Sequence, residues 1–280
     1  MLSAAPLRPL TSRHAVDWRS VILGGYLAYH FAALVPWATE LFSREGMLPR
    51  GTLSPLLHAF PNVLALHDGW LFVTLFVASG ALAATLLALG VRRRATALWC
   101  LFVLACVFGR NPLIRNPSLP YVGLALLAVV ATRGERIPKA VLHALWILLA
   151  VGYTYSGLTK LAAPSWIDGT AFGHVLQNPL AYEHAALVSA LPSWLLATAT
   201  YGVLALEILF PLLALSRRAR PWAWLAMTAL HVGLLLLIDF ADLTAGMLVI
   251  HAFVFDERWL KRTKLAPPGT SATAATSKGT

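Results

Sequence analysis

Charged side chains are scarce in this sequence, and acidic ones are the scarcer kind. Of its 280 residues, 12% are charged and 58% are hydrophobic, and the mean hydropathy is +0.69. A soluble protein of this length could not bury so much apolar surface, which excludes the ordinary soluble classes. We therefore predict an integral membrane protein in contact with the lipid bilayer.

Several signatures of common functional classes are also missing. The 22 basic residues stand in clusters at the ends of apolar runs, so we expect them to contact anionic lipid and not nucleic acid. No Gly-rich phosphate loop, HExxH motif or nucleophile elbow occurs, and we predict no metal site. No internal repeat stands out, which counts against the secondary transporters that consist of duplicated halves.

The sequence contains only two cysteines, Cys100 and Cys106. They lie six residues apart in one apolar run, which places them on different faces of a helix, with Cα atoms about 9 Å apart along its axis. That separation is too long for a disulfide. The spacing excludes a redox-active cysteine pair and favours packing as the role of both thiols.

Long apolar runs recur along most of the chain, separated by short polar breaks. About 20 apolar residues cross a bilayer as a helix, and the runs divide into eight candidate spans: 19–38, 69–90, 94–109, 119–132, 140–160, 193–215, 221–238 and 243–256. The predicted fold class is all-α, a polytopic bundle of about eight transmembrane helices.

We expect one transmembrane domain at 19–257, between a short N-terminal segment, 1–18, and a basic and then disordered tail, 258–280. Because no continuous apolar core precedes Val21, we expect the first span to be an uncleaved anchor and not a signal peptide.

The basic residues also predict the orientation of the spans. With eight spans and both termini in the cytoplasm, most of the 22 lysines and arginines fall in cytoplasmic segments, as the positive-inside rule requires. The two longest connections, 39–68 and 161–192, then lie outside. Each contains an apolar stretch too short to span, 53–60 and 171–182, and we expect the two to form a lid over the outer mouth of the bundle.

Ionisable side chains inside membrane spans are costly and therefore mark candidate functional positions. They are His30, His143, Lys160, Glu207, His231 and His251. An isolated carboxylate at Glu207, near the middle of its span, would cost about 2.5–3.5 kcal/mol. We expect it to be protonated or paired with a donor on another helix. Interhelical hydrogen bonding and a functional role are both open for Glu207, as are polar packing and proton transfer for His231.

Lys160 is the only lysine in a segment predicted to lie outside. Tyr153, Ser156, Gly157 and Lys160 are spaced i, i+3, i+4 and i+7, so they share one helix face, and the small residues there allow a helix or a flat ligand to approach. Two interpretations follow. Lys160 is an ordinary interface anchor, or its burial disfavours the charged form and makes it a usable base.

The residues around Lys160 form a recognisable pattern. The order Y-x-x-x-G-x-x-K-L followed by W-x-x-G resembles the central motif of the vitamin K-dependent gamma-carboxylase membrane domain, also called the horizontally transferred transmembrane (HTTM) domain. Weaker similarities follow in order over about residues 15–256. The matching positions are Asp17 to Arg19, Gly46 to Pro49, Tyr153, Gly157, Lys160, Leu161, Trp166, Gly169, Pro211, His231 and Gly246.

The resemblance implies a chemistry for this motif. In the carboxylase family the matching lysine is taken as the base that deprotonates reduced vitamin K. Lys160 is then the implied catalytic base, with His231 and Glu207 as further catalytic residues. The implied cofactor is a reduced menaquinone or vitamin K-type quinol, and the residues expected to bind it are Tyr153, Gly157, Trp166 and Asn116.

The sequence departs from the family at two places. The Asn-Asn-His segment of the family appears here as 115-RNPSLPY-121, which keeps Asn116 and has no histidine. The carboxylases continue into a lumenal domain that binds the peptide substrate, which these 280 residues do not include. We therefore do not expect gamma-carboxylation of a peptide, and any oxygenation would proceed without that histidine.

Three functions stay open on the sequence alone. The first is a quinol-dependent oxygenase or related lipid-quinone enzyme, an epoxidase or a lyase-like enzyme, in a bacterial inner membrane. The second is an accessory protein for peptide maturation or export, which would have a membrane or peptide partner. The third is a proton-coupled transporter that uses Glu207 and His231.

Overall fold

The computed structural model describes residues 17–48, 62–132 and 137–261. Every regular segment in these ranges is a helix, and the paired extended backbone there is one bridge between Ala181 and Ile238. Each of the eight predicted spans coincides with a helix: α1 (Trp18–Leu34), α5 (Trp70–Ala88), α6 (Arg93–Arg110), α7 (Leu119–Ala131), α8 (Lys139–Lys160), α12 (Ser193–Leu215), α13 (Arg220–Leu237) and α14 (Ala241–Phe253). The all-α prediction is confirmed for this part of the chain. The predictions for 1–16, 53–60 and 262–280 lie outside the described residues.

Within the described ranges, five segments are long and apolar enough to cross a membrane. They are α1 together with η1 (Val35–Trp37) and α2 (Ala38–Phe42), then α5, α8, α12 and α13. The chain is accordingly a multi-pass integral membrane protein. The helices at the other three predicted spans are not both long and apolar enough to cross. α6 contains three arginines, and α7 and α14 have 13 residues each. Thirteen residues make about 20 Å of helix, against roughly 30 Å of hydrocarbon.

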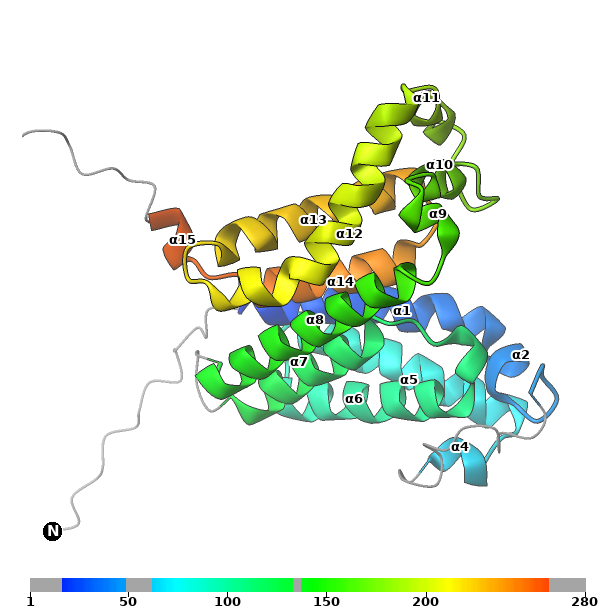
Figure 1. Ribbon diagram of the computed structural model, residues 1–280. Helices are drawn as coiled ribbons and strands as arrows, with labels where there is room; N and C mark the ends of the chain where they lie inside the picture. Colours follow the sequence, from blue (N-terminus) through cyan, green and yellow to red (C-terminus); the bar gives the residue numbers. More distant parts are fainter. Residues whose placement is uncertain (1–16, 49–61, 133–136, 262–280) are drawn as a thin grey trace, which may run out of the picture.

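The helices form two groups that meet at α14 and where α7 contacts α8. In one group α1 packs along α5, α5 along α6 and α6 along α7; in the other, α12 lies between α8 and α13, and α13 packs against α14. α14 also contacts α1 and α7, so it joins the two groups (Figure 1). The shared core is apolar and includes Leu27, Phe31, Val77 and Phe210. The two thiols are free and buried in it, as the spacing of Cys100 and Cys106 predicts.

Small residues allow α1 and α5 to approach closely. A Cβ added at Gly24 would lie 2.5 Å from the backbone nitrogen of Ala88 and 2.7 Å from the carbonyl oxygen of Ala84. Lipid tails are as apolar as the side chains, so close packing of this kind is a main source of helix association in a bilayer. The neighbouring Gly25 takes no part, because a Cβ there would meet no atom within 4 Å.

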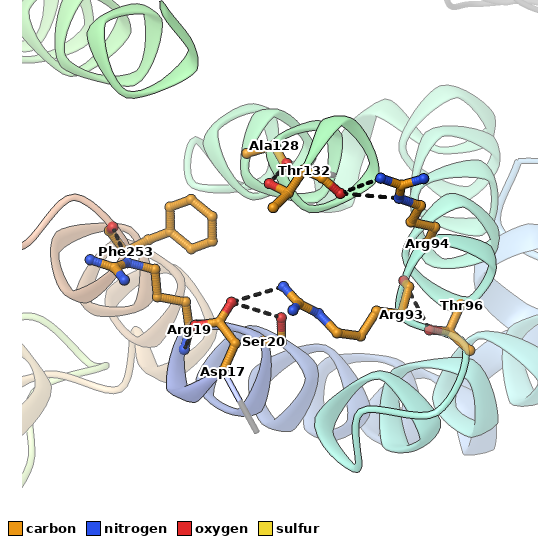
Figure 2. Close-up of polar contacts among 9 residues, drawn as sticks. All are labelled: Asp17, Arg19, Ser20, Arg93, Arg94, Thr96, Ala128, Thr132 and Phe253. Carbon is orange, nitrogen blue, oxygen red and sulfur yellow. Dashed lines mark hydrogen bonds and ion pairs between the residues drawn. The ribbon is translucent and has the colours of Figure 1, made fainter. Parts of the chain in front are cut away.

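Arginines at one end of the bundle bind the carbonyl groups with which neighbouring helices end (Figure 2). Arg94 donates from Nε and Nη2 to the carbonyl oxygen of Thr132, the C-cap residue of α7, at 3.0 and 2.6 Å. Arg19 donates from Nε to the carbonyl oxygen of Phe253, the last residue of α14, at 3.1 Å. Such donors satisfy carbonyls that have no partner in their own helix, and they suit the negative end of the helix dipole.

Asp17 holds the start of α1 at this same end. Its side chain accepts from the backbone N–H of Arg19, which caps the helix, and its Oδ2 lies 2.8 Å from Nη2 of Arg93 (Figure 2). The ion pair ties the beginning of α1 to the beginning of α6. The short helix α15 (Arg258–Lys261) lies at this end as well (Figure 1).

The described parts of the two long connections lie at the opposite end of the bundle (Figure 1), and their place outside the membrane stays a prediction. One contains α2 and α4 (Val63–Leu66), and the other contains α9 (Pro164–Ile167), α10 (Ala171–Leu176) and α11 (Ala185–Ser189). They pack on different helices: α2 contacts α5 and α4 contacts α6, whereas α9 and α10 contact α12. A joint lid stays a prediction, because the stretch 53–60 is not described.

Candidate functional site

Gly157 brings α8 and α12 into contact beside Lys160. A Cβ added at Gly157 would lie 2.8 Å from Cγ1 of Ile208 and 3.2 Å from Cβ of Glu207, so a larger residue would push the two helices apart. Gly157 is buried. The face of α8 that contains it is the one on which the sequence spacing predicts a close approach by another helix. The close approach places Glu207 within reach of the side chain one turn further along α8.

Lys160 and Glu207 form an ion pair between the two helices. Nζ of Lys160 lies 2.6 Å from Oε2 and 2.8 Å from Oε1 of Glu207, and 2.7 Å from Oγ of Ser156. These three acceptors match the three N–H groups of the ammonium. The expectation that Glu207 is protonated or paired with a donor on another helix is met by the pair. The Glu207 side chain is 7% exposed and the Lys160 side chain is 23% exposed.

The second half of the motif lies over the ion pair. Trp166, in α9, places its ring centroid 5.1 Å from Nζ of Lys160, which is a cation–π distance. The chain then turns at Gly169, which has a left-handed φ of 82° that favours glycine. A Cβ there would also lie 3.0 Å from the hydroxyl of Tyr201 in α12. The glycine in W-x-x-G is therefore required by the turn that returns the chain to α12.

Tyr153 and His231 belong to a second, buried group of polar residues. The Tyr153 hydroxyl lies 2.9 Å from Nε2 of His231 and 2.7 Å from Nε2 of His251. One hydroxyl has one proton, so it donates to one imidazole and accepts an N–H from the other, which makes the two histidines opposite tautomers. The ring of Tyr153 also packs on Phe210, with centroids 4.8 Å apart. Tyr153 is 7% exposed, so its predicted role in binding a ligand has no open surface here.

Asn116 belongs to a third group, centred on Asp242 at the start of α14. The Asp242 carboxylate accepts a hydrogen bond from the Asn116 amide, lies 2.8 Å from Nδ1 of His30 and accepts from the Tyr26 hydroxyl at 3.1 Å. Oδ1 of Asn116 in turn accepts from the backbone N–H of Ser118 at 2.8 Å. Asn116 therefore shares no contact with the Lys160 group.

The structure thus divides the seven predicted site residues among three groups. Lys160, Glu207, Gly157 and Trp166 come together; Tyr153 and His231 form the second group; Asn116 forms part of the third. Sequence reasoning missed Tyr26, although Tyr26 and His30 are spaced i, i+4 on one face of an apolar helix, a pattern that marks a shared polar contact.

In comparisons with known proteins, the chain matches no protein-family model, no curated protein and no solved structure.

Proposed function

We propose that this chain is an HTTM-type protein of a bacterial inner membrane, with eight spans and cytoplasmic termini, that deprotonates a lipid-soluble quinol at Lys160. One observation supports this most: a lysine and a glutamate pair at 2.6 Å between two membrane-spanning helices, with the lysine still 23% exposed. An ion pair there is costly to desolvate, and partial exposure leaves the lysine within reach of a ligand.

The pair offers a way to generate a base without a net change of charge. Passage of one proton from Nζ of Lys160 to the carboxylate of Glu207 leaves a neutral amine and a neutral acid, which a low dielectric favours over separated charges. The amine then accepts the proton of a quinol O–H, and the resulting ammonium stabilises the quinolate oxygen. A vitamin K-type quinol, when bound, supplies the electrons for reaction with oxygen.

The surroundings suit a flat, apolar ligand. The Trp166 ring offers an aromatic face beside Nζ of Lys160. On the flank of α8, Tyr155 is 70% exposed and Leu158 is 54% exposed, so a ligand dissolved in the bilayer meets apolar surface on its way to the pair. Ser156 gives the ammonium one acceptor that is not the carboxylate, which holds Nζ in place.

The experiment is turnover of reduced menaquinone and reduced vitamin K, with oxygen, by the purified protein in proteoliposomes. We expect epoxide from the wild type and a rate lower by about 10²-fold or more in Lys160→Ala, because a positioned general base contributes roughly 10²–10⁴. Arg93→Ala is the matched control, since it also removes one member of an interhelical ion pair. Absence of epoxide from wild type, or equal rates in Lys160→Ala, overturns the proposal.

A double variant separates chemistry from folding. Removal of one partner leaves the other charge buried, which costs about 3–5 kcal/mol, whereas replacement of both by apolar residues is often neutral. Lys160→Met with Glu207→Met is therefore expected to fold and to be inactive. Turnover retained in this double variant would mean that the pair only holds α8 and α12 together.

A further inference from the structure

A cavity of about 160 Å³ lies beside α1, and none of its lining residues belongs to the Lys160 group. The cavity is bordered by α1, α6, η3 (Pro112–Ile114), α7 and α14, and its lining includes Tyr29, His30, Ala33, Phe108 and Asp242. An apolar cavity of about 150 Å³ is large enough for benzene. This one could therefore hold a single aromatic ring.

His30 gives this cavity a directional polar group. Its Nδ1 lies 2.8 Å from Oδ1 of Asp242, whose carboxylate also accepts from Tyr26 and Asn116. A carboxylate only accepts, so Nδ1 of His30 carries a proton, and in the tautomer with its single proton on Nδ1 the other nitrogen, Nε2, is an acceptor. This Nε2 is buried and has no hydrogen-bond partner within the described part of the chain, while the residue is 7% exposed. A buried acceptor without a donor costs free energy and favours a ligand with an O–H group.

The cavity opens on the surface of α1. Tyr29 is 58% exposed, and Ala33 is exposed on the same side of the helix. His30 lies in the last third of α1, and other lining residues lie at helix ends, Leu119 at the start of α7 and Asp242 at the start of α14. A ligand would therefore enter near the membrane interface, which suits a small molecule with an apolar ring and one polar group.

We propose that this cavity, defined by His30, Asp242, Ala33 and Phe108, binds a phenol-type ligand whose hydroxyl donates to Nε2 of His30. The aromatic ring of the ligand contacts Phe108 and the side chains at the mouth of the cavity. Asp242 fixes the tautomer of His30 whose Nε2 accepts a hydrogen bond from the ligand hydroxyl. The inference does not rest on the function proposed for Lys160, since the two sites have no residue in common.

The experiment compares two probes of equal size in lipid nanodiscs: 4-fluorophenol, which has a hydroxyl, and 4-fluorotoluene, which does not. The full chain is labelled with 15N-histidine, and His30→Gln assigns the His30 signal among the nine histidines. We expect 4-fluorophenol to shift the Nε2 resonance of His30. We expect 4-fluorotoluene to leave that resonance in place and to bind roughly tenfold more weakly, the loss of one hydrogen bond.

Two variants at the surface of α1 control for folding. Ala33→Leu narrows the mouth and should weaken 4-fluorophenol binding about tenfold or more, whereas Ala32→Leu, at an adjacent exposed position outside the lining, should leave it unchanged. The double variant, Lys160→Met with Glu207→Met, should bind 4-fluorophenol like the wild type, so a failure of quinol turnover does not affect this result. No shift in the wild type, equal shifts from both probes, or equal binding by the two leucine variants overturns the proposal.

Discussion

Two adjacent glycines of α1 allow the contact with α5 to be measured on its own. Gly24→Ala places a Cβ 2.5 Å from the backbone nitrogen of Ala88, whereas Gly25→Ala places one in open space. Both substitutions gain the same helix propensity, about 1 kcal/mol relative to glycine. The difference between the two variants therefore isolates the cost of forcing the helices apart.

The size of that difference follows from the clash. The atoms in the way belong to the backbone of α5, which cannot rotate aside, so the helices must separate and lose contacts along their length. Overpacking of this kind costs roughly 1–3 kcal/mol. At about 2–4 °C per kcal/mol for a chain of this size, Gly24→Ala should melt about 2–12 °C below Gly25→Ala.

The two buried cysteines provide the assay for this difference in stability. Cys100 and Cys106 are free and fully buried, so a thiol-reactive fluorophore labels them only as the bundle opens. A thermal ramp of each variant in detergent gives the melting temperature. Equal melting temperatures for Gly24→Ala and Gly25→Ala would refute the close packing of α1 on α5.

Three further outcomes are expected elsewhere in the chain. Tyr153→Phe leaves two buried imidazoles without their shared hydroxyl and should lower stability by about 1–3 kcal/mol, measured in the same thiol assay, with a change in both histidine 15N signals. Arg94→Ala removes both donors to the carbonyl of Thr132, so amide exchange should accelerate in the last turn of α7 and not in α12. Hydrogen bonding from the Arg258 side chain lowers the pKa of Asp256. The NMR titration midpoint of Asp256 should therefore lie below the usual 3.9 and should rise in Arg258→Ala. The stability that the ionised Asp256 contributes is present above pH 3.9 and is lost as the pH falls through the lower midpoint.

The sequence predicts the helices well because each is a local pattern. The span expected at 140–160 appears as Lys139–Lys160, and the span expected at 193–215 has the same bounds in the structure. Apolar runs and polar breaks are sufficient for this, since a helix in lipid satisfies its own backbone. The same local reading cannot tell a spanning helix from a short one packed among others, so a crossing by α7 and α14, the two shortest of the predicted spans, stays a prediction.

The groups around the candidate site depend on which helices are neighbours, and a single sequence does not show this. Lys160 and Glu207 are 47 residues apart, and only the contact at Gly157 makes them partners. The glycine spacing predicted a close approach to some helix, but not to α12. Likewise nothing local indicates that Tyr153 lies between His231 and His251, because α13 and α14 must first fold back on α8. Asn116 was assigned to the Lys160 group through the resemblance alone, and its actual partner, Asp242, lies 126 residues away.

The contact between Arg19 and the end of α14 has a consequence for biosynthesis. The carbonyl of Phe253 is synthesised 234 residues after Arg19, the side chain that binds it. At about 5–20 residues per second, the first helix waits roughly 10–50 s for this partner. Until α14 is made, the guanidinium of Arg19 lacks this carbonyl, and the contacts of α14 with α1, α7 and α13 are missing between the two helix groups. The contacts that α14 makes with both helix groups therefore form late, when this helix enters the bundle.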